Sequence, residues 1–115
     1  MRNKKTNDKI LNLFVTRLKQ QFGNQIKKII LFGSRARGDN DAYSDYDFLV
    51  VCKNFSDEIK KYIDDLENDI LLTDFVLIST HLVSEEDFEK RIYEPYLMNA
   101  KKEGILVWQM NLKSN

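Results

Sequence analysis

Short apolar segments rich in β-branched and aromatic residues alternate along this chain with segments whose apolar residues recur every three or four positions. The first pattern is typical of β-strands and the second of amphipathic α-helices. Strands separated by helices favour an α/β (α+β) domain, in which helices pack on a small mixed sheet. A length of 115 residues fits one domain spanning residues 1–115. The predicted strands are 26–32, 46–52, 71–78 and 105–109.

The first predicted helix is bounded by residues that suit helix ends. Asn7 or Asp8 can cap its N-terminus, because a short polar side chain accepts hydrogen bonds from free backbone N–H groups. A single apolar stripe then runs to about Phe22. Gly23 is expected to end the helix by adopting a left-handed conformation.

The later helices carry similar signals. Ser56 precedes an amphipathic stretch, and Ser84 begins a sequence that resembles a capping box. The helix that follows Ser84 is expected to end or restart at Pro95, since proline cannot continue a helix from within. Gly104 then stops that segment before the short final strand.

Charge is balanced overall but unevenly distributed. The chain has 18 basic and 18 acidic residues, yet residues 1–38 hold ten basic residues and one acid, whereas residues 39–94 hold five basic and sixteen acidic residues. A basic half could meet nucleic acid or the phosphates of a small ligand, although a solvated lysine-rich helix face is the commoner cause. An acidic half could hold a metal ion or form a soluble surface, so the motifs decide between these readings.

Several classes of protein are excluded by composition. No apolar run approaches the roughly 20 residues of a membrane-spanning helix, and no signal-peptide region follows the basic residues near the N-terminus. We therefore expect a cytoplasmic protein with no membrane partner. Cys52 is the single cysteine, which excludes an intrachain disulfide framework and a cysteine-based zinc cluster.

Two carboxylates are the first candidates for a functional site. Asp45 and Asp47 are two residues apart at the start of a predicted strand, so both side chains point to the same face, with Cα atoms roughly 6.5–7 Å apart. A divalent cation between them would remove their mutual repulsion, and magnesium accepts one or two carboxylates together with phosphate oxygens. Asp74 precedes the apolar residues of the next predicted strand and could complete a two-metal site.

The segment before these acids suits a phosphate. Gly33 ends a predicted strand and lets an anion approach the backbone closely, while Ser34 adds a hydroxyl donor at the start of a helical turn. Arg35 and Arg37 supply fork-shaped donors for phosphate oxygens. A phosphate cradle followed ten residues later by a carboxylate pair is what a nucleoside triphosphate with magnesium needs.

The spacing resembles a known signature. Gly33-Ser34, ten residues, then Asp45-Tyr46-Asp47 is similar to the signature of the polymerase β-like nucleotidyltransferase superfamily. The longer strings Phe-Gly-Ser-Arg-Ala-Arg-Gly and Ser-Asp-Tyr-Asp-Phe resemble its minimal nucleotidyltransferase (MNT) branch, the MntA-like antitoxins that pair with HEPN-domain toxins. A Lys-Glu-Gly-Ile-Leu-Val-Trp segment at residues 102–108 extends the resemblance over nearly the whole chain. The resemblance implies the polymerase β-like nucleotidyltransferase fold.

The resemblance also implies the metal ligands. Asp45 and Asp47 would bind two Mg²⁺ ions, and Asp74, which matches the family's third acid, would bind the catalytic ion and help to deprotonate the attacking hydroxyl. Gly33 and Ser34 would hold the β- and γ-phosphates of ATP.

Charge neutralisation of the triphosphate would come from Arg37, with Arg35 as a second candidate. The nucleotide-binding residues are then Gly33, Ser34, Arg35, Arg37 and Ser44.

The implied reaction is adenylyl transfer (AMPylation) from ATP to an acceptor hydroxyl, which in this branch is a tyrosine of the HEPN toxin. Two alternatives stay open: an antitoxin that masks its partner by binding alone, and a nucleotidyltransferase for a small-molecule or RNA acceptor. A chain of 115 residues leaves little room for a second, acceptor-binding domain, which favours a partner protein that brings its own acceptor. Nucleic acid is not expected as a direct partner, and self-association is left open.

Competing sites are weaker. An EF-hand reading of Asp39-Asn40-Asp41 lacks the required glycine and terminal glutamate, and a P-loop reading of Gly33 lacks the following Gly-Lys-Ser/Thr. His81 is the only histidine, and we expect it in a loop after the third strand.

Overall fold

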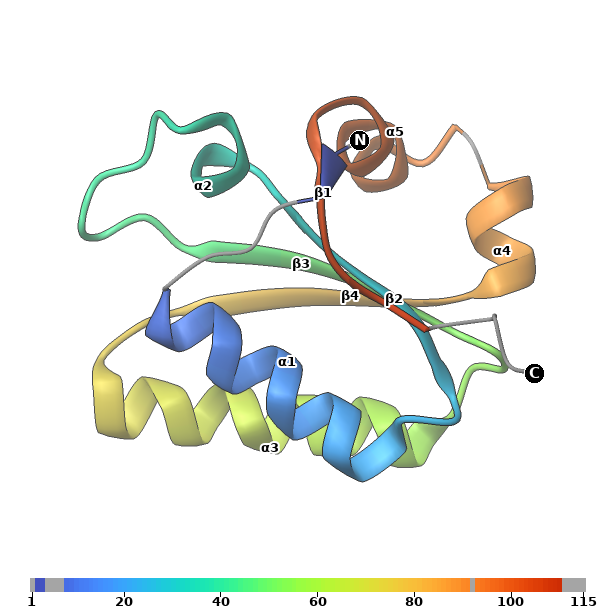
Figure 1. Ribbon diagram of the computed structural model, residues 1–115, viewed down its shortest axis with the longest axis horizontal. Helices are drawn as coiled ribbons and strands as arrows, with labels where there is room; N and C mark the ends of the chain where they lie inside the picture. The colour runs from blue at the N-terminus through green and yellow to red at the C-terminus, as the bar shows by residue number, and fades with distance from the viewer. Residues whose placement is uncertain (1, 4–7, 92, 111–115) are drawn as a thin grey trace.

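The computed structural model describes residues 2–3, 8–91 and 93–110, and these form a mixed sheet with helices on both faces (Figure 1). The strand order is β1-β5-β2-β3-β4. The outer pairs β1–β5 and β3–β4 are parallel, whereas β5–β2 and β2–β3 are antiparallel. The predicted small mixed sheet is therefore confirmed. The strands are β1 (Arg2–Asn3), β2 (Ile26–Phe32), β3 (Tyr46–Cys52), β4 (Ile78–Ser84) and β5 (Ile105–Gln109).

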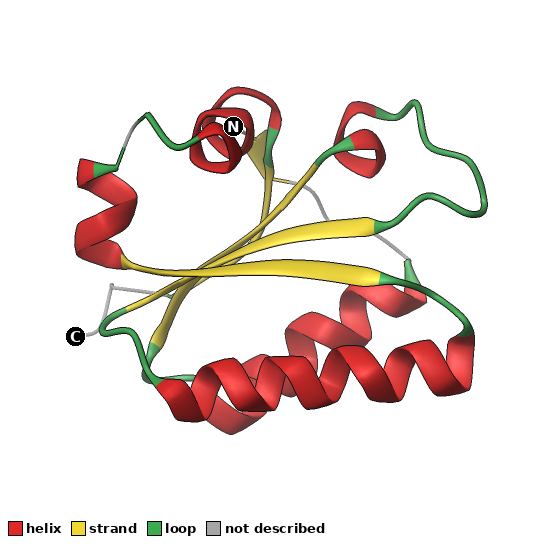
Figure 2. Cartoon of the chain, turned by 180° about the vertical axis from the view of Figure 1, so that it is seen from behind, coloured by secondary structure: helices red, strands yellow, loops and turns green. Residues whose placement is uncertain are grey.

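The helices form two layers, one on each face of the sheet (Figures 1 and 2). The long helices α1 (Lys9–Phe22) and α3 (Asp57–Asp74) cover one face. The shorter helices α4 (Glu85–Lys90) and α5 (Pro95–Glu103) lie on the other face, beside the single turn α2 (Ser34–Arg37). In the described part of the chain, no helix is long and apolar enough to cross a membrane.

Each layer encloses its own apolar core. Strand residues alternate between the two faces, so Phe48 packs toward α1 and α3, whereas Leu49 packs toward α4 and α5. Phe48 stacks on Phe14 of α1, with ring centroids 4.2 Å apart. On the second face, Leu97 of α5 is fully buried among the strand residues. Asp47, two residues before Leu49 in β3, therefore also belongs to the α4–α5 face.

Both predicted ends of α1 are confirmed, but only the N-terminal cap has the predicted form. The Asp8 carboxylate accepts hydrogen bonds from the N–H groups of Ile10 and Leu11, at 3.0 and 3.1 Å. Asn7, the other candidate cap, lies outside the described residues. The helix ends at Phe22 as expected, but Gly23 keeps a right-handed conformation, so the expected left-handed cap is wrong there.

The later boundaries are confirmed, except that α4 already ends at Lys90, and Pro95 starts the separate helix α5. The hydroxyl oxygens of Ser56 and Ser84 accept hydrogen bonds from the first turns of α3 and α4. Pro95 occupies the first turn of α5, where its missing N–H costs nothing. A Cβ at Gly104 would overlap the carbonyl oxygen of Ala100 and a methyl of Ile30, so this glycine allows the connection from α5 to β5 to lie close against β2.

The predicted strand at 71–78 is wrong. Helix α3 continues to Asp74, and β4 begins only at Ile78. The physical reason is the buried stripe of α3, which ends with Leu66 and Ile70 at helical spacing and carries the following residues along as a further turn. The apolar run after Ile70 is largely exposed to solvent instead of being buried in a strand.

Candidate active site

The ten-residue spacing of the motif is explained by the pairing of β2 with β3. These strands are antiparallel, with Phe32 opposite Asp47, so the end of β2 and the start of β3 lie at the same edge of the sheet. The connection between them contains α2, which starts directly after Gly33. The glycine and the carboxylates are therefore brought together although ten residues separate the two parts of the motif.

Gly33 is required by its conformation and by its contact with Asp47. Its φ of 78° lies in the region that side chains other than glycine rarely adopt. A Cβ at this position would overlap the Asp47 carboxylate. The absence of a side chain at residue 33 thus leaves the carboxylate directly against the backbone that opens α2.

A polar cleft of about 500 Å³ opens beside these residues. It brings together six of the eight predicted site residues, which come from the turn after β2, from α2, from the loop before β3 and from β3. Asn99 and Glu103 of α5 also line it, although the sequence reading assigned neither of them to a site. The sequence contains one indication of this placement: the apolar Leu97 and Ala100 mark the buried side of α5, so its other positions face outward. The full lining is Phe32, Gly33, Ser34, Arg37, Tyr43, Ser44, Asp45, Asp47, Asn99 and Glu103.

The two carboxylates repel one another. Partial burial raises the pKa of Asp47 above its usual value, and the negative charge of Asp45 raises it further. The His81 imidazole and the Arg37 guanidinium act in the opposite direction. An acid held in this position favours a bound cation, and a pair of carboxylates is what Mg²⁺ accepts when phosphate oxygens and water supply its other ligands.

Asp74 is not placed with this pair. It lies in the last turn of α3, where its carboxylate accepts a hydrogen bond of 3.0 Å from the hydroxyl of Thr73. Among the described residues, no group of three or more His, Cys, Asp or Glu side chains is arranged to hold a metal ion. The expected position of Asp74 at the start of a strand is therefore wrong, because that segment is helical. Its metal-binding role stays a prediction.

Arg37 lies in the cleft and is held by two acids. Its Nε donates to Asp39 at 3.1 Å and its Nη1 donates to Glu103 at 3.0 Å. These acids raise the pKa of Arg37, with the Asp39 hydrogen bond as the main cause. The pair with Glu103 connects α2 to the end of α5 across the cleft. A phosphate group would have to compete with both carboxylates for this guanidinium.

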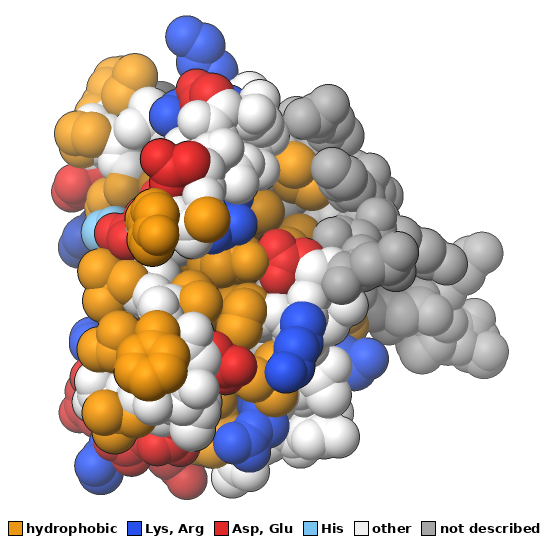
Figure 3. All heavy atoms as spheres, turned by 90° about the vertical axis from the view of Figure 1, so that its left-hand side faces the viewer, with side chains coloured by type: hydrophobic (Ala, Val, Ile, Leu, Met, Phe, Trp, Pro, Cys, Tyr) orange, Lys and Arg blue, Asp and Glu red, His pale blue; other side chains and the backbone are white. Residues whose placement is uncertain are grey.

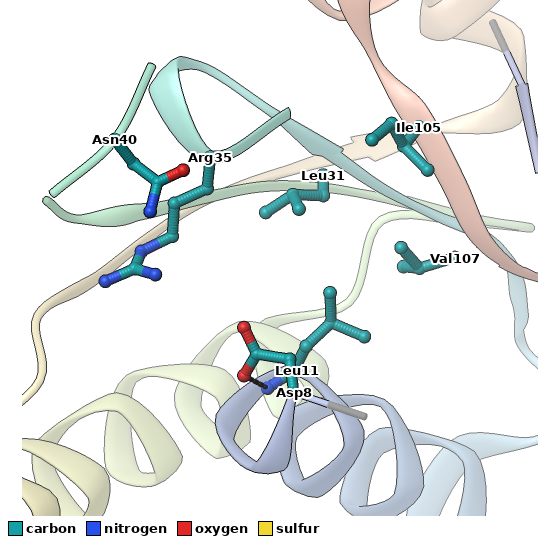
Figure 4. A pocket seen from close by; sticks show the side chains of 7 residues that line it. All are labelled: Asp8, Leu11, Leu31, Arg35, Asn40, Ile105 and Val107. Carbon is teal, nitrogen blue, oxygen red and sulfur yellow. Dashed lines mark hydrogen bonds between the residues drawn. The ribbon is translucent and has the colours of Figure 1, made fainter. Parts of the chain in front are cut away.

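Arg35 is directed away from the cleft. Its Nε donates to the carbonyl oxygen of Ser44 at 3.0 Å, and its guanidinium lies over the Tyr46 ring, 4.0 Å from the centroid. Figure 4 shows it on the α1 side of the sheet. It lines a separate cavity of about 130 Å³, together with Asp8, Leu11, Leu31, Asn40, Ile105 and Val107. Arg35 thus fastens α2 to the loop before β3, whereas Arg37 faces the cleft.

His81 occupies a strand instead of the expected loop. It lies in β4, opposite Leu49 of β3, and stacks on Tyr96 with ring centroids 4.2 Å apart. Ser79 lies opposite Asp47 in the same parallel pair. Residues opposite one another point to the same face, so Ser79 and His81 belong to the Asp47 side of the sheet. The sequence placed His81 in a loop and gave Ser79 no role, because the predicted strand began and ended too early.

The chain matches the family described as nucleotidyltransferase domain over residues 11–107. It is 40% identical over 101 residues to "Putative protein adenylyltransferase MJ0604" of Methanocaldococcus jannaschii, a match that covers 88% of this chain and 97% of that protein. The fold and the cleft thus define an enzyme domain for nucleotidyl transfer. This chain belongs to the nucleotidyltransferase domain family and is a nucleotidyltransferase.

Solved structures share the fold. A toxin–antitoxin structure with AMP-PNP has a TM-score of 0.56 at 18% identity, over 85% of this chain and 73% of that chain. A mutant structure of the toxin–antitoxin MntA–HpeT has a TM-score of 0.53 at 16% identity, over 83% and 70% of the two chains. At these identities the likeness establishes a common architecture.

Proposed function

We propose that this nucleotidyltransferase transfers AMP from Mg-ATP to a hydroxyl group of a partner protein. The observation that carries the proposal is the cleft in which Gly33 and Ser34 meet Asp45 and Asp47. The relative MJ0604, named a protein adenylyltransferase, supports a protein as the acceptor. ATP as donor agrees with a cytoplasmic location.

The phosphate end of the nucleotide is assigned to the start of α2. Gly33 leaves room for a phosphate beside the backbone, and Ser34 supplies a hydroxyl. Arg37 neutralises charge on the triphosphate once it exchanges its acidic partners for phosphate oxygens. Ser44 lines the same cleft from the loop before β3 and extends the nucleotide-binding set.

The carboxylates would hold the metal. Asp45, just before β3, and Asp47, within it, both line the cleft and suit Mg²⁺, which would supply charge neutralisation for the triphosphate and the leaving pyrophosphate. The acceptor oxygen forms its bond to the α-phosphorus while the bond from that phosphorus to the pyrophosphate oxygen breaks. The hydroxyl proton passes to a carboxylate of the pair or to water. The chain's own contribution is to position the reactants and to neutralise charge.

The acceptor is proposed to be a tyrosine of a HEPN-domain toxin, with this chain as the antitoxin. The toxin–antitoxin structures named above support a toxin as the partner. The cleft lies at the edge of the sheet and is open to solvent, so a hydroxyl on the surface of a second protein can reach it.

The test is to co-express the chain with the product of the adjacent gene and to measure the intact mass of that product. Wild-type chain is expected to add one or more AMP units. The double variant Asp45→Asn/Asp47→Asn is expected to add none, because it removes both metal-binding carboxylates. Asp65→Asn serves as the matched control, since Asp65 is an exposed acid on α3 that pairs with Lys61.

Each other outcome has a distinct meaning. A partner that stays unmodified but still binds indicates an antitoxin that acts by masking. A partner that neither binds nor gains mass overturns the proposal and directs attention to small-molecule or RNA acceptors. Equal modification by wild-type and double-variant chains shows that the carboxylate pair is not the catalytic centre.

A further inference from the structure

Large apolar side chains gather on the face where α3 ends and the loop before β3 lies (Figure 3). Two of them, Leu72 and Phe75, are 75% and 86% exposed, and Tyr43 is 93% exposed. Soluble proteins rarely leave such side chains together in water without a function for them. We call this set the apolar patch, and its members are Tyr43, Leu71, Leu72, Phe75 and Leu77.

The backbone conformation of Phe75 is also unusual for an exposed apolar residue. Its φ of 56° makes it the one non-glycine residue with a positive φ in the described part of the chain. A left-handed residue after a helix is usually glycine or asparagine, because a larger side chain is strained there. Phe75 accepts this strain and gains no burial in return. Such a residue is explained when another molecule covers its side chain.

The patch adjoins the cleft. Tyr43 lines the cleft and belongs to the patch. The carbonyl oxygen of Leu77 accepts a hydrogen bond of 3.0 Å from the N–H of Tyr46, the residue between Asp45 and Asp47. A molecule seated on the patch therefore reaches the mouth of the cleft.

The surrounding charge indicates what kind of molecule fits. No lysine or arginine occurs in residues 39–52 or 62–89, which contain the whole patch. Acids lie within both segments, among them Asp41, Asp69 and Asp74. The neighbouring Arg35 and Arg37 are already engaged, Arg35 by the carbonyl oxygen of Ser44 and Arg37 by two carboxylates. The acids of the patch segments favour a protein surface with an apolar centre and a basic rim over nucleic acid or an anionic membrane.

We propose that the apolar patch is the docking surface for the acceptor protein, which presents an apolar centre flanked by lysine or arginine. The inference rests on the proposed function, because docking here brings the acceptor hydroxyl to Asp45 and Asp47. Binding energy comes from covering the exposed leucines and Phe75, while the acids set the orientation and the rate of association.

The test uses a variant designed to keep its fold. Leu72→Gln/Phe75→Asn removes two apolar side chains, and asparagine suits the left-handed position better than phenylalanine. Tyr93→Asn is the matched control, since Tyr93 is an equally exposed aromatic residue in the connection between α4 and α5. Three quantities are measured: the Kd for the product of the adjacent gene, AMP transfer to it, and Mg-ATP binding by the chain alone.

The patch variant is expected to weaken partner binding at least about tenfold and to lose AMP transfer in parallel. Its affinity for Mg-ATP and that of the Tyr93→Asn control should stay within about twofold of wild type. Charge is tested by Asp69→Lys, which should weaken partner binding and reduce its dependence on salt.

The outcomes separate this inference from the proposed function. If wild-type chain binds the partner through the patch without modifying it, docking stands and AMP transfer fails. Partner binding that is unchanged by Leu72→Gln/Phe75→Asn overturns the docking surface while leaving AMP transfer intact. A wild-type dimer that this variant dissociates, or nucleic acid that only wild type retains, assigns the patch to another occupant and overturns the inference. No binding of the partner by wild-type chain overturns both.

Discussion

The hydroxyl of Tyr46 donates a hydrogen bond of 2.6 Å to Oδ2 of Asp8, 38 residues earlier in the chain. The other carboxylate oxygen of Asp8 caps α1. The guanidinium of Arg35 lies over the Tyr46 ring. Because side chains alternate along β3, Tyr46 points away from the cleft that receives Asp45 and Asp47. One residue therefore connects the start of β3 to both α1 and α2 from the face opposite the cleft.

Tyr46→Phe is expected to lower the free energy of unfolding by about 1.5–3 kcal/mol, the usual worth of a hydrogen bond to a charged group. The variant keeps the ring beneath Arg35 and removes only the hydroxyl. Urea unfolding followed by circular dichroism measures the change. Tyr43→Phe is the control, because Tyr43 is exposed and its loss should leave stability unchanged within about 0.5 kcal/mol.

The hydrogen bond between Tyr46 and Asp8 also predicts that the protein loses stability in alkali. Burial and the hydrogen bond to Asp8 raise the pKa of Tyr46 above its ordinary value of 10.0. The unfolded chain therefore loses this proton at lower pH than the folded chain. The stabilisation is fully present below about pH 10 and declines as pH rises toward the higher folded pKa. The difference in stability between wild type and Tyr46→Phe should shrink above pH 10, and a constant difference would contradict this account.

Gly33→Ala is expected to destabilise the fold and to abolish AMP transfer. The added Cβ would meet the Asp47 carboxylate and would sit at a positive φ, a combination that costs on the order of 1–3 kcal/mol. Gly38→Ala is the matched control. Gly38 has a φ of 85° but open space around its Cα, so only the backbone cost applies. Gly33→Ala should lower both the midpoint temperature of thermal unfolding and the rate of AMP transfer more than Gly38→Ala does.

Much of the fold could be predicted because local signals agree with the tertiary structure. Asp8, Ser56 and Ser84 cap helices as their residue types suggest. The strands 26–32 and 46–52 were recognisable because their β-branched and aromatic residues are buried between two layers. Their relative direction could not be read from the sequence, since a connection containing one helical turn is compatible with several arrangements until the pairing is known.

The less predictable parts are those where a local pattern has two meanings. Leu71 and Leu72 lie in a further turn of α3 after its buried stripe ends at Ile70, yet these apolar residues also suit a strand, and only the packing decides. The arginines of α2 are alike in sequence but differ in direction. Arg35 bonds to Ser44 on the α1 side, whereas Arg37 faces the cleft, because successive residues of a helical turn point to different sides.

Arg37→Ala is expected to raise KM for ATP about tenfold, with a smaller effect on kcat, because the charge-assisted hydrogen bonds to the triphosphate are lost. Glu103→Gln should have the opposite effect on KM, since it removes a carboxylate that competes for Arg37. Steady-state kinetics with varied ATP separates the two parameters. Arg91→Ala is the control, because Arg91 pairs with an acid on α4 outside the cleft. An unchanged KM in Arg37→Ala would exclude contact with the nucleotide.

The last prediction concerns the third acid. The resemblance to the minimal nucleotidyltransferases gives Asp74 the same importance as Asp45, whereas the structure places it at the end of α3, bonded to Thr73. From this geometry, Asp45→Asn should reduce AMP transfer by about 10²-fold or more, while Asp74→Asn should reduce it less than about tenfold. Single-turnover measurements at saturating Mg-ATP compare the two rates, with Asp65→Asn as a control on the same helix.

If Asp74→Asn reduced AMP transfer as much as Asp45→Asn, the result would contradict the position of Asp74 in the structure. It would require the end of α3 to change conformation when nucleotide binds, so that Asp74 joins the pair. The left-handed Phe75 and the exposed leucines before it make this the segment whose rearrangement would break the fewest buried contacts. Hydrogen exchange of residues 71–77 with and without Mg-ATP distinguishes the cases. A fixed helix end keeps its protection, whereas a rearranging end changes it only when the nucleotide is present.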